Sequence, residues 1–189
     1  MHPKSESLIA EYFEEGKKLL ASISTSEVAR LAHAIEEIRN SDSTVYVAGN
    51  GGSASTASHF ATDIGVGSLR RANPVKVVSL CDNAAVMTAL ANDITYDSVF
   101  EQQIKLLGSA GDLLVLISAS GNSQNLVKAA EAARALNLKV FTLTGFDGGI
   151  LKQLTPESNV HVPSRVGAYG LVEDAHLAIC HVITECVRS

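Results

Sequence analysis

Residues 44–60, TVYVAGNGGSASTASHF, join a β-branched apolar run to a glycine-rich turn and the start of a helix. The run from Thr44 to Gly49 is typical of a buried strand, because strands that are covered on both faces read as nearly continuous apolar segments. The small residues after it allow a tight turn, and the following stretch opens a helix. A strand, a turn and a helix in this order indicate an α/β fold with a parallel sheet.

The same alternation recurs along the chain. Further strand-like runs are KVVSL (76–80), DLLVLIS (112–118), KVFTLTG (139–145) and NVHVP (159–163), with helical stretches between them. They predict a five-stranded, doubly wound parallel sheet in a three-layer αβα sandwich. We expect one domain over residues 1–189, and we interpret residues 65–74, GVGSLRRANP, as a long polar loop.

Two amphipathic helices are predicted before the first strand. Apolar residues recur at helical spacing between about Glu6 and Ser22. Ser24 and Glu27 then have the spacing of a capping box, and an apolar stripe follows as far as Ile38. We expect residues 1–42 to form a helical extension that packs against another subunit, because the sheet does not need both helices as cover.

Composition favours a small ligand or a protein partner. The 189 residues are 46% hydrophobic and carry a formal net charge of -5, so nothing attracts the chain to nucleic acid or to an anionic membrane surface. The first residues mix charges into the apolar positions, unlike a signal peptide, and no run is long enough for a membrane span. Three cysteines without a CxxC pair suggest neither a disulfide framework nor a thiolate zinc site. We expect a cytoplasmic protein.

Two strand-to-helix turns are candidates for a phosphate site. Ligands bind beyond the carboxyl ends of the strands in open α/β sheets, and the turns at 49–55 (GNGGSAS) and 118–123 (SASGNS) follow two predicted strands. Their hydroxyls and free helix N–H groups suit phosphate oxygens. Either turn alone could equally be ordinary turn and capping sequence. Gly49, Gly51 and Ala54 also fit a dinucleotide fingerprint, but the acidic partner expected about 20 residues later is missing.

Histidine and carboxylate residues recur on two predicted helices. His59 and Asp63 are four residues apart on one helix face, and Glu173 and His181 lie about 80° apart on the last helix. Such residues could bind a divalent metal such as zinc or form an acid–base constellation. A single pair of this kind is more often a surface interaction, and His176 falls on the other side of Glu173.

Several ordered motifs resemble a known family. The segments GNGGSASTASHFATD (49–63), LANDITYD (90–97), ISASGNSQNLVKAA (117–130), LTGFDGG (143–149) and EDAHLAICH (173–181) are similar to the bacterial phosphoheptose isomerases, which are SIS-domain sugar isomerases. The resemblance implies a homotetramer with active sites at subunit interfaces and a divalent metal at each, for which zinc is the expected ion. It also implies conversion of D-sedoheptulose 7-phosphate into D-glycero-D-manno-heptose 7-phosphate, in heptose biosynthesis for lipopolysaccharide or capsule.

The resemblance also assigns residues by position. It places the sugar phosphate at Asn50, Gly51, Gly52, Ser53, Asn92, Asp93, Ser118, Ala119, Ser120, Ser123 and Glu173, with the four serines on the phosphate. It places the metal at His59, Asp63, Glu173 and His181, with Asp63 as the base and His181 as the acid.

This chain departs from the family at several of these positions. Asp63 stands where the family usually has Glu, and Glu173 where it has Gln. Two arginines usual in the family are replaced by Gly67 and Leu171, although Arg70 and Arg71 are close to the first. The shorter Asp63 puts the base assignment in question, because small displacements of a catalytic group cost rate. We expect the extra charge of Glu173 to strengthen metal binding.

A second function class stays open. SIS proteins can be phosphosugar sensors, or adaptors that associate with a replication initiator, and such proteins can keep the phosphate cradle without an acid–base pair. The carboxylate at Asp63 and the imidazole at His181 favour the enzyme.

Overall fold

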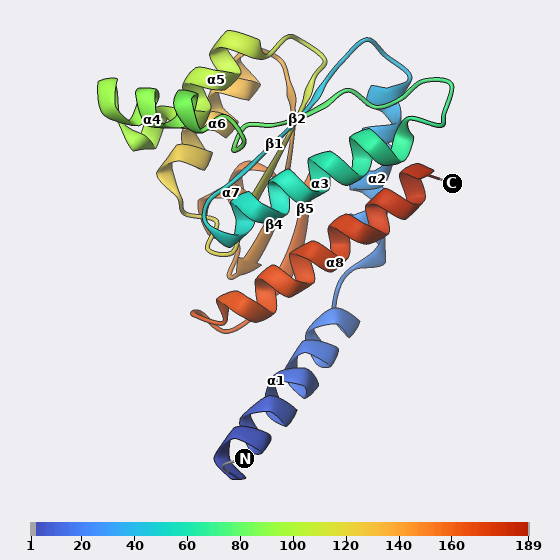
Figure 1. Ribbon diagram of the computed structural model, residues 1–189, viewed down its shortest axis with the longest axis vertical. Coiled ribbons are helices and arrows are strands. Elements are labelled where there is room, and N and C mark those ends of the chain that lie inside the picture. The colour runs from blue at the N-terminus through green and yellow to red at the C-terminus, as the bar shows by residue number, and fades with distance from the viewer. Residues whose placement is uncertain (1–2, 189) are drawn as a thin grey trace.

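The computed structural model describes residues 3–188 and contains a five-stranded parallel sheet with the order β2-β1-β3-β4-β5 (Figure 1). The strands are β1 (Val45–Gly49), β2 (Val77–Ser79), β3 (Leu113–Ser118), β4 (Lys139–Phe146) and β5 (Asn159–Pro163). The helices are α1 (Pro3–Ala21), α2 (Thr25–Arg39), α3 (Gly52–Ser68), α4 (Ala84–Asp93), the 3-10 helix η1 (Tyr96–Ser98), α5 (Val99–Leu107), α6 (Gln124–Ala135), α7 (Gly149–Leu154) and α8 (Tyr169–Arg188). The predicted doubly wound α/β architecture is confirmed.

Helices cover both faces of the sheet because successive strand residues point to opposite sides. Val47 and Val115 pack in one apolar cluster with α2, α3 and α8. Ala48 and Leu116 pack in a second cluster with α5, α6 and α7. Figure 1 shows α3 and α8 side by side over one face.

The two serine turns meet because of the strand order. β1 pairs with β3 in parallel, with Gly49 opposite Ile117 near their carboxyl ends. Since the connection from β1 runs outward to β2, the winding reverses between β1 and β3, and sheets of this order bind ligands at that switch point. The turn after β1 and the turn after β3 therefore border the same crevice.

The two N-terminal helices differ in how they are covered. α2 is capped by the Ser24 hydroxyl, which accepts from the Glu27 N–H at 3.3 Å, and its stripe from Val28 to Ile38 is buried in the core. The Glu27 carboxylate accepts the N–H of His161 at 3.0 Å on the edge strand β5. α1 instead projects from the body and exposes apolar side chains that include Phe13, which is 70% exposed (Figure 1). Of the two N-terminal helices, α1 therefore exposes the larger apolar face.

The interpretation of residues 65–74 as a loop is wrong over its first part, because α3 continues to Ser68. Glycine disfavours helix, but here close packing requires it. A Cβ at Gly65 would approach Val77 to 3.1 Å, and a Cβ at Gly67 would overlap the Arg188 side chain of α8. Packing against β2 and α8 therefore extends the helix through a glycine-containing stretch.

The remaining broad expectations concern cysteines and membrane spans. Cys81, Cys180 and Cys186 form no disulfide bond within the described residues. Among residues 3–188, no helix combines the length and the apolar character that crossing a membrane requires.

Candidate active site

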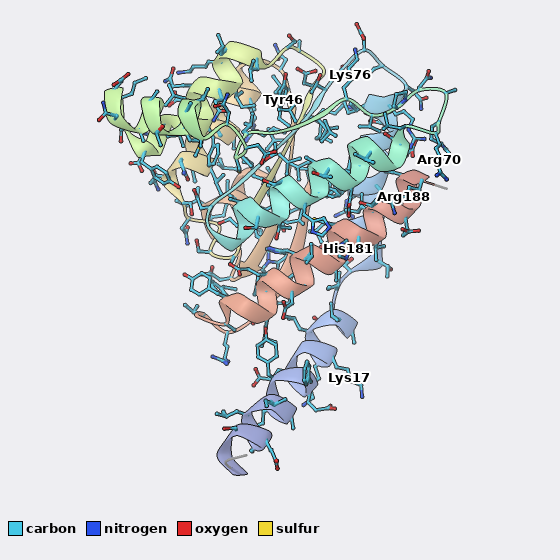
Figure 2. The ribbon with its side chains drawn as sticks, viewed as in Figure 1. Lys17, Tyr46, Arg70, Lys76, His181 and Arg188 are labelled. Carbon is cyan, nitrogen blue, oxygen red and sulfur yellow. The ribbon has the colours of Figure 1, made fainter. Side chains whose placement is uncertain are left out.

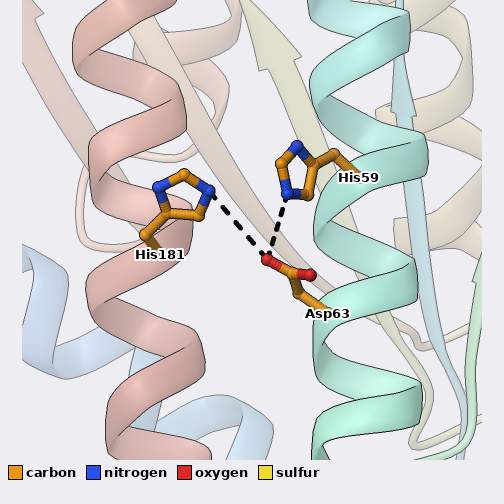
Figure 3. Close-up of side chains that lie close together, drawn as sticks. All are labelled: His59, Asp63 and His181. Carbon is orange, nitrogen blue, oxygen red and sulfur yellow. Dashed lines mark ion pairs between the residues drawn. The ribbon is translucent and has the colours of Figure 1, made fainter.

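His59, Asp63 and His181 come together between α3 and α8 (Figure 3). The Asp63 Oδ2 lies 3.2 Å from His59 Nε2 and 4.0 Å from His181 Nε2. His59 and Asp63 are one turn apart on α3, and Figure 2 shows His181 on α8 where that helix runs beside α3. The structure thus unites three of the four residues expected to bind a metal.

The three side chains suit a divalent cation. Their ligand atoms all lie within 4.8 Å of one another, and small side-chain rotations would bring them to the separations of about 3.3–3.6 Å that tetrahedral bonds to one zinc ion require. The imidazoles are about half exposed and Asp63 is 26% exposed, so the cluster is open to solvent. Two histidines and one carboxylate with an open side match the ligand pattern of catalytic zinc sites.

The two serine turns enclose a hollow of about 140 Å³ at the N-terminus of α3. Its lining residues are Asn50, Ser53, Ile117, Ser118, Ala119, Ser120, Ser123, Tyr169 and Glu173. Hollows of about 650 Å³ occur elsewhere, but they contain neither serine turn, so the chemistry favours the smaller hollow. The four serines and Ala119 that the resemblance assigns to the sugar phosphate thus border one hollow.

Glycine residues shape the first turn. Gly51 has a φ of 55°, in the region that favours glycine, and immediately precedes α3. A Cβ at Gly49 would overlap the backbone of Ser53. This close approach brings the free N–H groups at the start of α3 to the hollow, where they favour an anion.

The serine hydroxyls of the second turn can accept a hydrogen bond within the turn and donate another to a ligand. Ser118 Oγ accepts the Gly121 N–H at 3.0 Å, and Ser120 Oγ accepts the Asn122 N–H at 3.3 Å. These bonds are those of an ordinary turn, and they use an oxygen lone pair. Each hydroxyl keeps its hydrogen, which can be donated to a phosphate oxygen.

Comparison with known proteins identifies the family. The sequence model of the SIS domain matches residues 11–145. A phosphoheptose isomerase from Helicobacter pylori (strain P12) is 36% identical over 173 residues, which cover 91% of this chain and 88% of that protein. A probable phosphoheptose isomerase from Thermoplasma volcanium is 32% identical over 96% of this chain and 91% of its own length. The chain belongs to the SIS-domain phosphoheptose isomerase family.

The fold agrees with that family over its full extent. The structure of a phosphoheptose isomerase from Francisella tularensis superposes with a TM-score of 0.89 at 29% identity, covering 97% of this chain and 98% of that one. The agreement includes α1 and α2 as well as the sheet, since almost the whole chain is aligned. The resemblance found in the motifs is therefore confirmed.

Glu173 is placed differently from the other expected metal ligands of this family member. It lies eight residues before His181 on α8, about 12 Å along the helix, and it does not belong to the metal-ligand group found in residues 3–188. Its carboxylate instead lines the serine hollow and lies against Gly52, where an added Cβ would overlap it. The geometry gives no support to the expectation that Glu173 strengthens metal binding.

Asn92 and Asp93 lie at the end of α4, outside the residues that line the hollow. The Asn92 Nδ2 donates to the Asp93 carboxylate at 2.8 Å. The link to the hollow runs through Tyr96, three residues further on, whose hydroxyl donates to Asn50 Oδ1 at 2.8 Å. Sequence reasoning missed this role of Tyr96, although the residue belongs to the quoted segment 90–97.

α1 contacts α8 beside the hollow. The Tyr12 hydroxyl donates to Asp174 at 2.6 Å. This hydrogen bond, with burial and the nearby charges of Asp174 and Glu173, raises the pKa of Tyr12 to about 12. The phenol therefore stays protonated at neutral pH and holds α1 to the helix that carries Glu173 and His181.

His176 has a structural role. It is fully buried, and burial lowers its pKa to about 4. The Thr144 backbone lies near enough to oppose this shift, but neither ring nitrogen makes a well-formed hydrogen bond with the residues that the structure describes. His176 lies on the side of α8 that faces the core, away from the cluster.

Proposed function

We propose that this protein is an aldose–ketose isomerase that converts D-sedoheptulose 7-phosphate into D-glycero-D-manno-heptose 7-phosphate, in heptose biosynthesis. The observation that carries the proposal is that His59 and Asp63 of the cluster lie on α3, the helix whose N-terminus borders the serine hollow, with His181 of α8 beside them. Ser53 and His59 are six residues apart, about 9 Å along α3, a distance that an extended sugar phosphate can cover. The names of the relatives agree with this substrate.

The hollow would hold the phosphate. Ser53, Ser120 and Ser123 can donate hydroxyl hydrogens, and the free N–H groups of α3 add partial positive charge. Binding without lysine or arginine leaves the phosphate held by neutral donors, which favours release of the product.

Proton transfer would use the cluster. Isomerisation needs a base that removes the proton from the carbon beside the carbonyl. It also needs an acid that donates a proton or a hydrogen bond to the developing oxyanion. The Asp63 carboxylate can take the proton, and a protonated His181 can donate to the enediolate oxygen. The proposed base and acid already lie close together, since His181 Nε2 is 4.0 Å from Asp63 Oδ2.

Zinc is the cofactor we propose, held by His59 and by one carboxylate oxygen of Asp63 and one ring nitrogen of His181, which would leave the second oxygen of Asp63 and the second ring nitrogen of His181 for proton transfer. When bound, the ion would polarise the substrate carbonyl and stabilise negative charge on the enediolate. Glu173 would instead accept hydrogen bonds from sugar hydroxyls, because its carboxylate lies at the hollow.

The proposed assembly is a homotetramer in the cytoplasm, where phosphorylated sugars are produced and consumed. The apolar face of α1 supports an assembly, because an exposed strip of this kind is normally covered by another chain.

The deciding experiment is incubation with sedoheptulose 7-phosphate and zinc, followed by detection of the aldose product. We expect turnover that is lost in Asp63→Asn. A protein that binds the sugar phosphate but yields no product would instead be a sensor or an adaptor, and the isomerase proposal would be abandoned.

A further inference from the structure

The Asn50 side chain is held by two other segments of the chain. Asn50 Nδ2 donates to Asn125 Oδ1 at 2.9 Å, and Asn125 Nδ2 donates back to Asn50 Oδ1 at 2.9 Å. The Tyr96 hydroxyl donates to the same Asn50 Oδ1 at 2.8 Å. Three hydrogen bonds therefore converge on one amide that lines the serine hollow.

The amide pair connects the two serine turns. Asn50 belongs to the turn after β1, and Asn125 lies in the first turn of α6, two residues after Ser123. Asn125 is 2% exposed, so its amide has no access to water that could replace these bonds. The pair thus joins the turn after β1 to the start of the helix that follows β3.

Tyr96 adds a third segment. Its ring is about half exposed, and it lies in η1, which follows α4 and the Asn92–Asp93 pair. Its bond to Asn50 fixes this segment against the hollow.

The bonding pattern also orients the Asn50 amide. A carboxamide oxygen has two acceptor positions, and Tyr96 and Asn125 fill both on Asn50 Oδ1. Asn50 Nδ2 uses one N–H on Asn125 and keeps the second N–H. Because Asn50 lines the hollow, that remaining donor is available to an anion there.

We propose that Asn125 and Tyr96 are positioning residues for the phosphate hollow: they fix the separation of the two serine turns and turn an Asn50 N–H towards the ligand. This inference rests on the proposed function only in taking the hollow as a phosphate site. Both side chains bond Asn50 rather than a residue of the His59–Asp63–His181 cluster, so both act on affinity rather than on proton transfer.

Titration calorimetry of the full-length protein with inorganic phosphate tests the role of Tyr96. Tyr96→Phe removes one hydrogen bond and should weaken phosphate binding about five-fold. The matched control is Tyr46→Phe, which also removes one tyrosine-to-acceptor bond, from Tyr46 to the Leu107 carbonyl at 2.9 Å, outside the hollow. The control should lose stability with unchanged phosphate affinity.

Asn125→Ala should weaken phosphate binding more strongly, about ten-fold or more, because both bonds between the turns are lost. Asn159→Ala is its control, since Asn159 is a buried amide that bonds Thr142 and Thr144 away from the hollow. In the double variant Tyr96→Phe/Asn125→Ala the two losses should be non-additive, because both act through Asn50.

The kinetic signature separates positioning from a merely structural role. With sugar phosphate as substrate, KM should rise in both variants while kcat stays within about two-fold. A fall in kcat with unchanged phosphate affinity would overturn the inference. So would phosphate binding in Tyr96→Phe and Asn125→Ala equal to that of the wild type, or wild-type binding no tighter than that of Ser120→Ala.

Failure of the isomerase proposal gives a different result. In that case no aldose forms, yet the calorimetric losses in Tyr96→Phe and Asn125→Ala still appear.

Discussion

The Glu173 carboxylate of α8 lies directly against Gly52, the first residue of α3. An anion at a helix N-terminus is favourable, so in the free protein Glu173 occupies part of the field that a substrate phosphate would use. Gly52 permits this contact because any Cβ there would overlap the carboxylate. The relationship makes Glu173 a competitor for the positive end of α3.

Glu173→Gln should therefore bind inorganic phosphate about five- to ten-fold more tightly, because a negative charge beside the hollow is removed while the shape is kept. Titration calorimetry measures the change. Asp174→Asn is the control, since it removes a charge from the adjacent position, which is directed at the Tyr12 hydroxyl. Equal gains in both variants, or weaker binding in Glu173→Gln, would show that Glu173 does not compete for the site.

Metal binding should depend on His59, Asp63 and His181. We expect His59→Ala and His181→Ala each to lower zinc affinity at least ten-fold in a competition titration with a chromogenic chelator, because each removes one of three ligands. His33→Ala is a matched control, since His33 and Glu37 form a similar pair at 3.4 Å on α2. Zinc affinity that is unchanged in His59→Ala, or full activity after exhaustive chelation, contradicts the metal proposal.

Substitutions in the His59–Asp63–His181 cluster should lower kcat, whereas a substitution in the serine hollow should mainly weaken phosphate binding. Asp63→Asn keeps the shape of the side chain but removes the base, and we expect kcat to fall by at least about 10²-fold with sugar phosphate binding retained. His181→Ala should behave in the same way. Ser120→Ala should raise KM and weaken phosphate binding with a smaller change in kcat. Full turnover in Asp63→Asn would assign the base to another residue.

Because of His176, the free energy of unfolding should decrease as the pH is lowered. Burial lowers the pKa of its imidazole to about 4, whereas in the unfolded chain the pKa is near 6.5. Between these values the unfolded chain binds a proton that the folded protein does not, so unfolding becomes easier as pH falls from 6.5 to 4. The full effect is on the order of 3 kcal/mol.

Urea unfolding at pH 7.5 and pH 5 measures this dependence. His176→Leu should remove most of it, leaving the smaller contribution of His161, whose pKa burial also lowers. An equally steep fall in His176→Leu would assign the dependence to other groups.

The apolar face of α1 should be required for assembly. Phe13→Glu places a charge on its most exposed aromatic side chain and should reduce the mass measured by light scattering. Leu106→Glu is the control, because Leu106 on α5 is 82% exposed but lies outside α1. A monomeric mass for the wild type would refute the tetramer.

Local sequence patterns were sufficient to predict the architecture, but they did not predict features that depend on tertiary packing. The strands and the α2 cap were predictable because an apolar run and the Ser24 hydroxyl determine the structure of residues next to them in the sequence. The end of α3 was not, because Gly65 and Gly67 are helical only through their packing against Val77 and Arg188.

The sequence by itself determined the parallel α/β sheet, the two serine turns and the residue types of the acid–base cluster, because strand periodicity and turn chemistry are local properties. Only the tertiary structure decided that His181 meets Asp63 while Glu173 faces the hollow. Glu173 and His181 lie on one face of α8. Because α8 runs parallel to α3, Glu173 lies beside the first residue of α3, Gly52, and His181 lies beside Asp63 further along that helix. The Asn50–Asn125–Tyr96 junction likewise depends on which strand ends are neighbours, and residue spacing along the chain does not contain that information.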